Sequence, residues 1–277
     1  MIPQAYITAW RASAPWADDA QVEQDLVLSR ALVQIFANPD LQGLLALRGG
    51  TALNKLFLRS PARYSEDIDL VQVQAGPIGP VIDTIRAVLD GWLGQPRRSA
   101  SQGNMTLAYR FESEVPPVRM LRLKVETNTR EHFAVLGLQR RRFEVKNAWF
   151  TGAAEVVTYD INELLGTKLR ALYQRRKGRD LFDLWLCIEN GLMQAEEVIK
   201  CFLRYMQSEQ HTVSRAQFEQ NLHEKSSDEA FLSDLPALLA SGVNYDASAA
   251  LDRVKKTIVE RLPGGAWAGP SQSSSHT

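Results

Sequence analysis

Two aspartates, Asp67 and Asp69, stand two positions apart in the stretch RYSEDIDL at residues 63–70. They alternate with Ile68 and Leu70, and this period-2 pattern predicts a half-buried β-strand with both carboxylates on one face. Like charges held side by side repel each other unless a cation neutralises them or they lie at the wet end of the strand. The stretch therefore indicates either a cation site or an ordinary solvated strand end.

A third acid, Glu126, lies on the polar side of a later predicted strand at residues 118–128. If that strand pairs next to residues 66–72, its carboxylate can join the two aspartates. Three such oxygen ligands would hold Mg²⁺ or Mn²⁺ and leave positions for water and a substrate phosphate. Two metals can activate an attacking hydroxyl and stabilise a pyrophosphate leaving group. By itself, Glu126 also fits a solvated position on an amphipathic strand.

A short apolar run, a turn of Gly49, Gly50 and Thr51, and a helical pattern follow one another in LLALRGGTALNKLFL at residues 44–58. Glycines let the backbone approach a ligand closely. The free N–H groups and the positive dipole at the start of the helix favour an anion such as a triphosphate. Lys55, one turn into the helix, could reach the same site or point into water. Two glycines also form turns without a ligand, so the turn matters because it directly precedes the aspartates.

The periodicity of apolar residues predicts the elements that position these groups. Helices are predicted over 20–37, capped by Asp18-Asp19, and over 80–93; strands over 105–111 and 118–128 and in an extended stretch around 141–158; and helices almost throughout from Asp160 onward. The helical part includes predicted helices near 230–240 and 247–261. The periodicity of these elements and their order along the chain together predict an α/β fold in which helices and strands are segregated (α+β).

This change of period divides the chain into domains. We expect an N-terminal helix plus an α/β domain over residues 1–158, a helical domain over 159–262 and a disordered tail over 263–277, which is rich in Gly, Ser and Pro. A boundary of this kind favours a cleft between the two domains, where ligands usually bind.

Composition limits the function classes. The 277 residues are 45% hydrophobic and 23% charged, as in ordinary globular proteins, and no apolar run approaches the ~20 residues that span a bilayer. The first residues lack the apolar core of a secretory signal, so we expect a cytoplasmic protein with no membrane contact. Cys187 and Cys201 fit neither a metal motif nor a disulfide framework and are predicted to be buried thiols. With 32 basic and 32 acidic residues, only local basic patches such as Arg140–Arg142 and Arg175–Arg179 remain for nucleic acid.

Four motifs in order, RGGTALNK, RYSEDIDL, LKVETN and ELLGTKLRALYQRRKGRDLFDLW, resemble those of the AbiEii/MenT-type nucleotidyltransferase toxins of bacterial toxin-antitoxin and abortive-infection systems. These toxins belong to the DNA polymerase β-like nucleotidyltransferase superfamily. The resemblance covers about residues 45–190. It implies a polymerase β-like nucleotidyltransferase domain with a mixed sheet, followed by an all-helical domain that completes the active-site cleft.

The resemblance also implies roles for the matching residues. Asp67, Asp69 and Glu126 would be catalytic metal ligands; Gly49, Gly50 and Thr51 would bind the NTP; Lys168 and Asp183 look like the lysine and aspartate that the helical half contributes in this family. Lys55, Ser65, Arg179 and Asp180 are further candidates for nucleotide binding.

The residues of the helical half also have bland interpretations. Lys168 could be a solvated lysine on a helix, or its ammonium could counter the charge that develops on phosphate oxygens. Gly178 is predicted to end one helix, so Asp180 could cap the next helix or act in catalysis. Asp183 lies among apolar neighbours and needs a partner, for which Arg179 at i−4 is a candidate.

Ser65 supports a separate hypothesis. It precedes Asp67 by two residues and should share its strand face. Phosphorylation there would add about −2 charge beside the metal carboxylates and should silence the enzyme.

We therefore predict a metal-dependent nucleotidyltransferase toxin that moves NMP from an NTP to an acceptor. By the resemblance, that acceptor is the tRNA 3′ end and the partner is a cognate antitoxin protein. Basic residues at 140–142 and 170–177 would help to hold the RNA backbone. The alternatives are a protein or small-molecule acceptor, such as an antibiotic, and a non-catalytic nucleotide-binding protein on the same fold.

Overall fold

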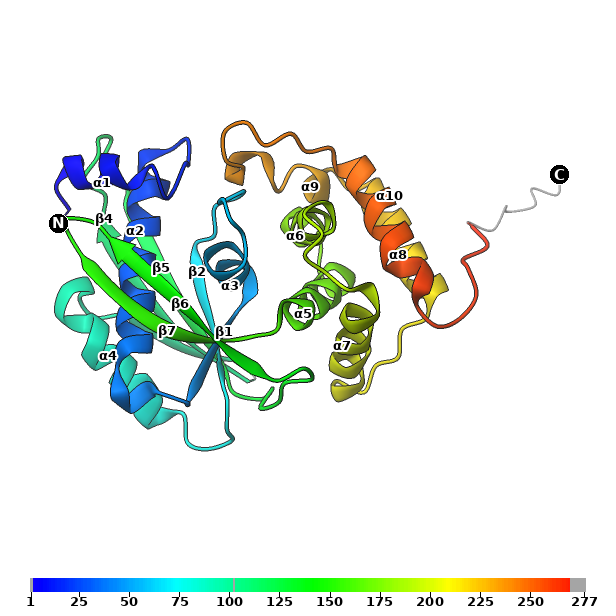
Figure 1. Ribbon diagram of the computed structural model, residues 1–277, viewed down its shortest axis with the longest axis horizontal. Coiled ribbons are helices and arrows are strands. Elements are labelled where there is room, and N and C mark those ends of the chain that lie inside the picture. The colour runs from blue at the N-terminus through cyan, green and yellow to red at the C-terminus, as the bar shows by residue number, and fades with distance from the viewer. Residues whose placement is uncertain (1, 102, 270–277) are drawn as a thin grey trace. The chain divides into compact units, whose positions relative to one another are not determined.

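The computed structural model describes residues 2–101 and 103–269 (Figure 1). The chain divides into two compact units. The first runs to Asp160 and includes Leu238–Val243, and the second holds Ile161–Ala237 and the chain from Asn244 onward. The returning segment joins the first unit through backbone hydrogen bonds, since Tyr64 N–H donates to the Leu238 carbonyl and Ala240 N–H donates to the Ala62 carbonyl.

One mixed sheet organises the first unit. Within the described residues its order is β3-β4-β5-β2-β1-β7-β6. The strands are β1 Leu45–Arg48, β2 Asp67–Gln72, β3 Arg97–Ser101, β4 Asn104–Glu112, β5 Met120–Asn128, β6 Leu138–Lys146 and β7 Thr151–Tyr159. β2 runs antiparallel to β1 and parallel to β5. The predicted α/β class with a mixed sheet is confirmed, while β3 lies in a segment for which the sequence had suggested no strand.

Four helices accompany the sheet in the described part of this unit: α1 Gln4–Trp10, α2 Asp19–Ala37, α3 Gly49–Leu56 and α4 Gly79–Leu93. The Asp18 carboxylate accepts a hydrogen bond of 2.9 Å from the Ala20 N–H and caps α2, as predicted. α2 packs against β5 and β7, and α4 packs against β4. These helices bury the apolar side chains of the central strands.

Alternation along β4 and β5 separates this covered face from an open one. Every second side chain is buried, as at Leu107, Tyr109, Leu123 and Val125. The intervening side chains are partly or fully exposed. Asp67 and Asp69 extend the open series, because they pair in register with β5 residues of that series.

The second unit is helical in its described residues. Its helices are α5 Ile161–Gln174, α6 Gly178–Glu189, α7 Ala195–Ser208, α8 Arg215–Ser226, α9 Glu229–Leu232 and α10 Ala247–Thr257. α5 packs against α6 and α7, and α10 packs against α6. Gly166 allows α5 and α7 to approach, because a Cβ there would lie 2.6 Å from the Cys201 Cβ. α8 lies in the part predicted to be almost wholly helical but was not named as a separate helix, although its Ser214 and Gln217 form a capping box.

The tail begins with a packed segment. In residues 263–269, the Trp267 N–H donates to a Glu219 carboxylate oxygen at 2.7 Å, and the Trp267 ring contacts His223. The rest of the predicted tail, 270–277, lies outside the described residues. Cys187 and Cys201 are buried and form no disulfide within the described residues, as predicted. No helix in the described ranges is long and apolar enough to cross a membrane.

Candidate active site

Asp67 and Asp69 lie at the start of β2 with both side chains partly exposed. Asp67 Oδ1 is buried and has no hydrogen-bond partner. Burial, together with the charge of Asp69, raises the pKa of Asp67 to about 6. The charges of Lys124 and Arg122 lower this pKa in part, yet no cation of the described residues forms an ion pair with either carboxylate. The two carboxylates, called the aspartate pair below, therefore form a site of incompletely compensated negative charge.

Glu126 reaches the same face by strand pairing. β5 lies next to β2, with Asp69 opposite Glu126 and Asp67 opposite Lys124. The Glu126 carboxylate binds the Lys124 ammonium at 2.5 Å, and this contact and the Glu126 charge raise the pKa of Lys124 although burial lowers it. No group of three acidic, histidine or cysteine side chains in the described ranges is close enough to hold an ion. The predicted pairing of strands is thus present, while Glu126 turns to Lys124.

The turn before α3 lies directly against the aspartate pair. Gly49 has a φ of 77°, and a Cβ there would lie 2.2 Å from the Asp69 Oδ2. Only glycine fits both conditions. The structure starts α3 at Gly49 itself, so the free N–H groups of the first turn begin beside Asp69.

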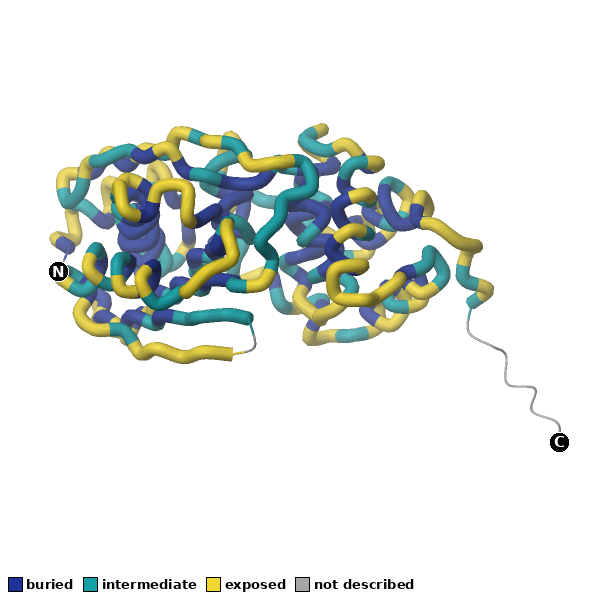
Figure 2. Tube along the Cα trace, turned by 90° about the horizontal axis from the view of Figure 1, so that it is seen from below, coloured by how far each residue is buried: buried dark blue, intermediate teal, exposed yellow. Residues whose placement is uncertain are grey.

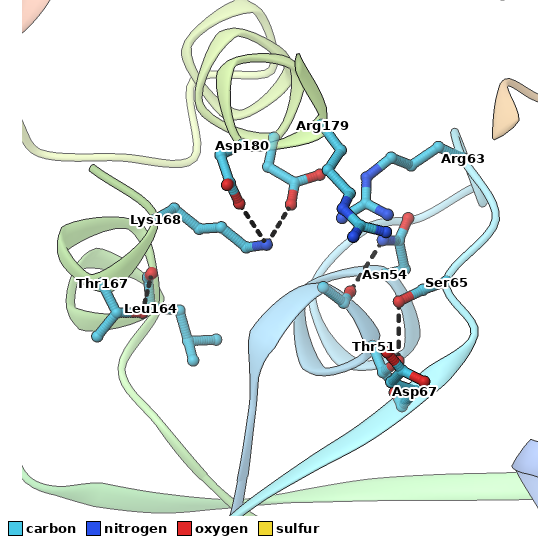
Figure 3. A network of polar contacts seen from close by, with 12 residues as sticks. Thr51, Asn54, Arg63, Ser65, Asp67, Leu164, Thr167, Lys168, Arg179 and Asp180 are labelled. Carbon is cyan, nitrogen blue, oxygen red and sulfur yellow. Dashed lines mark hydrogen bonds and ion pairs between the residues drawn. The ribbon is translucent and has the colours of Figure 1, made fainter. Parts of the chain in front are cut away.

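Thr51 and Ser65 tie the turn to β2. The buried Thr51 hydroxyl donates to the Asp67 carbonyl at 2.5 Å, which leaves the Ser65 hydroxyl to donate to Thr51 Oγ1 at 2.9 Å (Figure 3). Asn54 donates to the Gly50 carbonyl at 2.9 Å, while its own Oδ1 is buried without a partner. The turn is therefore held rigidly by side chains, and Thr51 acts as a brace within it.

Arg63 is a site residue that the sequence reasoning missed. Its side chain is buried, its Nη1 donates to the Tyr64 carbonyl at 3.0 Å, and a Cβ at Gly50 would lie 2.5 Å from its Nη2. A guanidinium thus lies against the turn that is suited to phosphate. The available signal was its position two residues before Ser65 and four before Asp67, which corresponds to the same side of an extended chain.

Lys55 forms an ion pair with α2. Its ammonium binds both oxygens of Asp25, at 2.6 and 2.7 Å, and its side chain is mostly buried. Lys55 therefore does not point into water, and it lines one pocket together with Arg63 and Ser65.

A second charged group lies within the helical unit. Lys168 on α5 is buried and its ammonium contacts Asp183 at 2.9 Å and Asp180 at 3.2 Å (Figure 3). Arg175 also binds Asp180, at 2.7 Å. Although burial opposes it, Lys168 and Arg175 lower the pKa of Asp180. These four residues, called the helical cluster below, balance two acids with two cations.

This geometry corrects two expectations. Gly178 begins α6 and does not end the preceding helix, because α5 stops at Gln174 and a Cβ at Gly178 would lie 2.4 Å from the Phe231 carbonyl oxygen. The N-cap of α6 is Lys177, so Asp180 lies inside the first turn, fully buried. Lys168 is not a solvated lysine.

Arg179, a candidate for nucleotide binding, follows Gly178 in the first turn of α6. Its backbone N–H donates to Asp234 at 3.4 Å.

The family described as "Nucleotidyl transferase AbiEii toxin, Type IV TA system" matches residues 30–253. The chain therefore belongs to the AbiEii nucleotidyltransferase toxin family, and family and fold support nucleotidyl transfer as its general activity.

Two solved structures show the same fold. The MenT4 nucleotidyltransferase toxin from Mycobacterium tuberculosis is 16% identical with a TM-score of 0.68, and the match covers 95% of this chain and 91% of that one. JHP933 from Helicobacter pylori is 18% identical with a TM-score of 0.54, and the match covers 89% and 94% of the two chains. No curated protein matches the chain.

Proposed function

We propose that the chain is a metal-dependent toxin that transfers NMP from an NTP to the 3′ end of tRNA and so blocks translation. The observation that carries this proposal is the aspartate pair beside the Gly49 turn. A pair of incompletely compensated carboxylates next to free helix N–H groups suits a cation and a phosphate together. The membership of the AbiEii family supports the transfer chemistry, an NTP substrate and an antitoxin partner.

The donor set fits a divalent metal. Hard carboxylate oxygens are the ligands that Mg²⁺ and Mn²⁺ prefer, and Asp67 Oδ1 lacks any partner inside the protein. Asp67 and Asp69 would hold the ion, with Glu126 joining if it exchanges its contact with Lys124. When bound, such ions supply charge stabilisation at the phosphate oxygens.

The remaining groups would bind and orient the substrate. The first N–H groups of α3 and the Arg63 guanidinium would hold the triphosphate, and Thr51 and Ser65 would keep the turn in place. In the helical unit, we propose Lys168 as a further catalytic residue, as the family resemblance implies. Asp180 and Asp183 position its ammonium, at 3.2 and 2.9 Å. NTP and tRNA coexist in the cytoplasm, where we propose the reaction takes place.

The test is to incubate the purified protein with total bacterial RNA, Mg²⁺ or Mn²⁺ and each α-phosphate-labelled NTP in turn. An Asp67→Asn/Asp69→Asn variant serves as the control. We expect label in a tRNA-sized band from one NTP, only with metal and only with both aspartates. Label found only in a protein or a small molecule would show that this molecule, and not tRNA, is the acceptor. No turnover of any NTP would mean that the site binds nucleotide without transferring it.

A further inference from the structure

The open face of β3, β4 and β5 carries unusual charges. On this face stand, among others, Arg97 on β3, Arg110 on β4 and Arg122 on β5, all exposed. β3 is exposed along its whole length, as Figure 2 shows for the strand that leads to the grey residue 102. We call these three residues the arginine face.

Strand register connects the arginine face to the aspartate pair. Arg97 pairs with Ala108, Ala108 with Lys124, and Lys124 with Asp67, so one row across four strands ends at the candidate site. Neighbouring strands are about 4.8 Å apart, so Arg97 and Asp67 are separated by about 14 Å of sheet. Arg122 stands two residues from Lys124 on the same side of β5.

The arginine face is electrostatically incomplete. Arg110 and Arg122 pair directly across β4 and β5, and like charges in such positions destabilise a sheet. The guanidinium groups of Arg97, Arg110 and Arg122 form no ion pair or hydrogen bond within the described ranges. Asp67 interacts electrostatically with Arg122, but no acid within the described ranges forms an ion pair with the three arginines, so an external anion would relieve the remaining repulsion.

Most of the other basic residues that the sequence suggested for RNA binding already contact an acidic or aromatic side chain. The contacts are Arg170 with Glu209, Arg175 with Asp180, Arg176 with Asp228, Lys177 with Asp234, and Arg141 stacked on the Phe57 ring. A polyanion would have to break these contacts, whereas the arginine face is available without such a cost.

We propose that the arginine face binds the phosphate backbone of a single-stranded RNA 3′ end and leads it along the sheet to the aspartate pair. The choice of RNA as the acceptor rests on the proposed function. The surface itself follows from register and charge, because exposed cations without ion pairs on one sheet face are complementary to a chain of phosphates. Small residues such as Ala108 between the arginines leave room for the strand.

The test measures RNA binding without nucleotide. The probe is a 5′-fluorescein-labelled, unstructured RNA of about 12 nucleotides, within the usual range of single-strand sites. Fluorescence anisotropy with the full chain compares the wild type with Arg97→Gln/Arg110→Gln/Arg122→Gln. The matched control is Arg98→Gln/Arg253→Gln/Lys256→Gln, which removes the same charge from other exposed positions. Arg98 is adjacent to Arg97, yet it contacts Asp83 of α4 on the other side of the sheet.

We expect the triple variant of the arginine face to bind at least about tenfold more weakly and to lower the slope of log K against log salt by about 2, since each lost single-strand phosphate contact removes about 0.7. The control should bind like the wild type. The melting temperature of the Arg110→Gln single variant should be equal or higher, because the like-charge pair is gone.

Equal weakening in both triple variants would overturn the inference, as would undiminished binding in the first or no binding by the wild type at low salt. The transfer assay is run separately on the same proteins. RNA labelled equally well by the wild type and the arginine-face variant would refute this surface while the proposed function stands. Binding that depends on the arginine face without any transfer would support the surface and refute the proposed acceptor chemistry.

Discussion

The two charged groups of the molecule treat their acids in opposite ways. At the aspartate pair, two carboxylates lie side by side and one oxygen of Asp67 has no hydrogen-bond partner among the described residues. The neighbouring cations are bound elsewhere, Lys124 to Glu126 and Arg48 to Glu131. In the helical cluster, Asp180 and Asp183 are buried more deeply, yet cations contact both. A site that lacks a charge must be completed by a ligand, whereas a balanced cluster is already assembled. We therefore expect the loss of charged groups to have opposite effects on stability in the two places.

The largest effect is expected for Asp67→Asn/Asp69→Asn. Loss of the metal-binding charges should slow nucleotidyl transfer by at least about 10³-fold, since metal ions supply several kcal/mol of transition-state stabilisation. The melting temperature should stay equal or rise, because a repulsion is removed. Transfer assays and thermal melting measure the two outcomes, with the exposed Asp83→Asn as the control. A clear loss of stability in the double variant would contradict the description of the pair as incompletely compensated.

Lys168→Met should act in the opposite direction. It leaves two buried carboxylates short of a cation, and breaking a buried ion pair costs about 3–5 kcal/mol. Urea denaturation should show this loss, while Lys200→Met, at an exposed lysine of α7, should change little. Adding Asp183→Asn to Lys168→Met should recover part of the stability. Unchanged stability in the single variant would mean that the cluster is not charge-balanced as described.

Substitutions of Ser65 test how strongly added negative charge beside the Gly49 turn lowers nucleotidyl transfer. Ser65→Asp places a carboxylate beside Thr51 and the aspartate pair and should lower transfer by at least about tenfold, by like-charge repulsion. Ser65→Ala loses only the 2.9 Å hydrogen bond to Thr51 and should retain most activity. Equal activity of Ser65→Asp and wild type would remove the idea of control by phosphorylation at this position.

Glu23 on α2 extends the comparison to a third incompletely compensated acid. Its side chain is buried, its Oε1 has no partner, and burial raises its pKa to about 7. The unfolded chain ionises at lower pH, so the free energy of unfolding should fall as the pH rises through this range and level off above about 7. Glu23→Gln should remove this dependence. Allowing for screening by water, the free energy of unfolding of the Glu23→Gln variant should exceed that of the wild type by about 1 kcal/mol at pH 7.5 and should equal it at pH 4.5. Chemical denaturation at both pH values decides, and equal pH profiles would contradict the assignment.

Much of the fold could be predicted from local patterns. The alternation around Ile68 and the helical period at residues 20–37 show which side chains are buried, because the spacing of hydrophobic residues indicates burial. β3 was missed because its residues are all exposed and carry no such signal. α8 was not named as a separate helix for a similar reason, since its polar sequence has a weak apolar stripe, of which Phe218 and Leu222 are buried.

The candidate site could be predicted only in its chemical types. The aspartates, the glycine turn and the candidates Lys168, Asp180 and Asp183 all follow from motif and resemblance, whereas the ion pairs of Lys168 with both acids do not. The contacts that a long side chain makes do not follow from motif or resemblance. Lys55 binds Asp25, thirty positions away, and Arg63 lies on Gly50, because those neighbours are set by packing between elements.

The sequence by itself determined the class of protein and the strand face shared by Asp67 and Asp69, since period-2 alternation and motif order are local properties. Only the tertiary structure decided that β5 pairs beside β2, that Lys168 is neutralised by Asp180 and Asp183, and that arginines from three strands lie on one face. The physical reason is that charge interactions depend on distance in space. Residues far apart in the chain compensate or repel one another only after folding has placed them side by side.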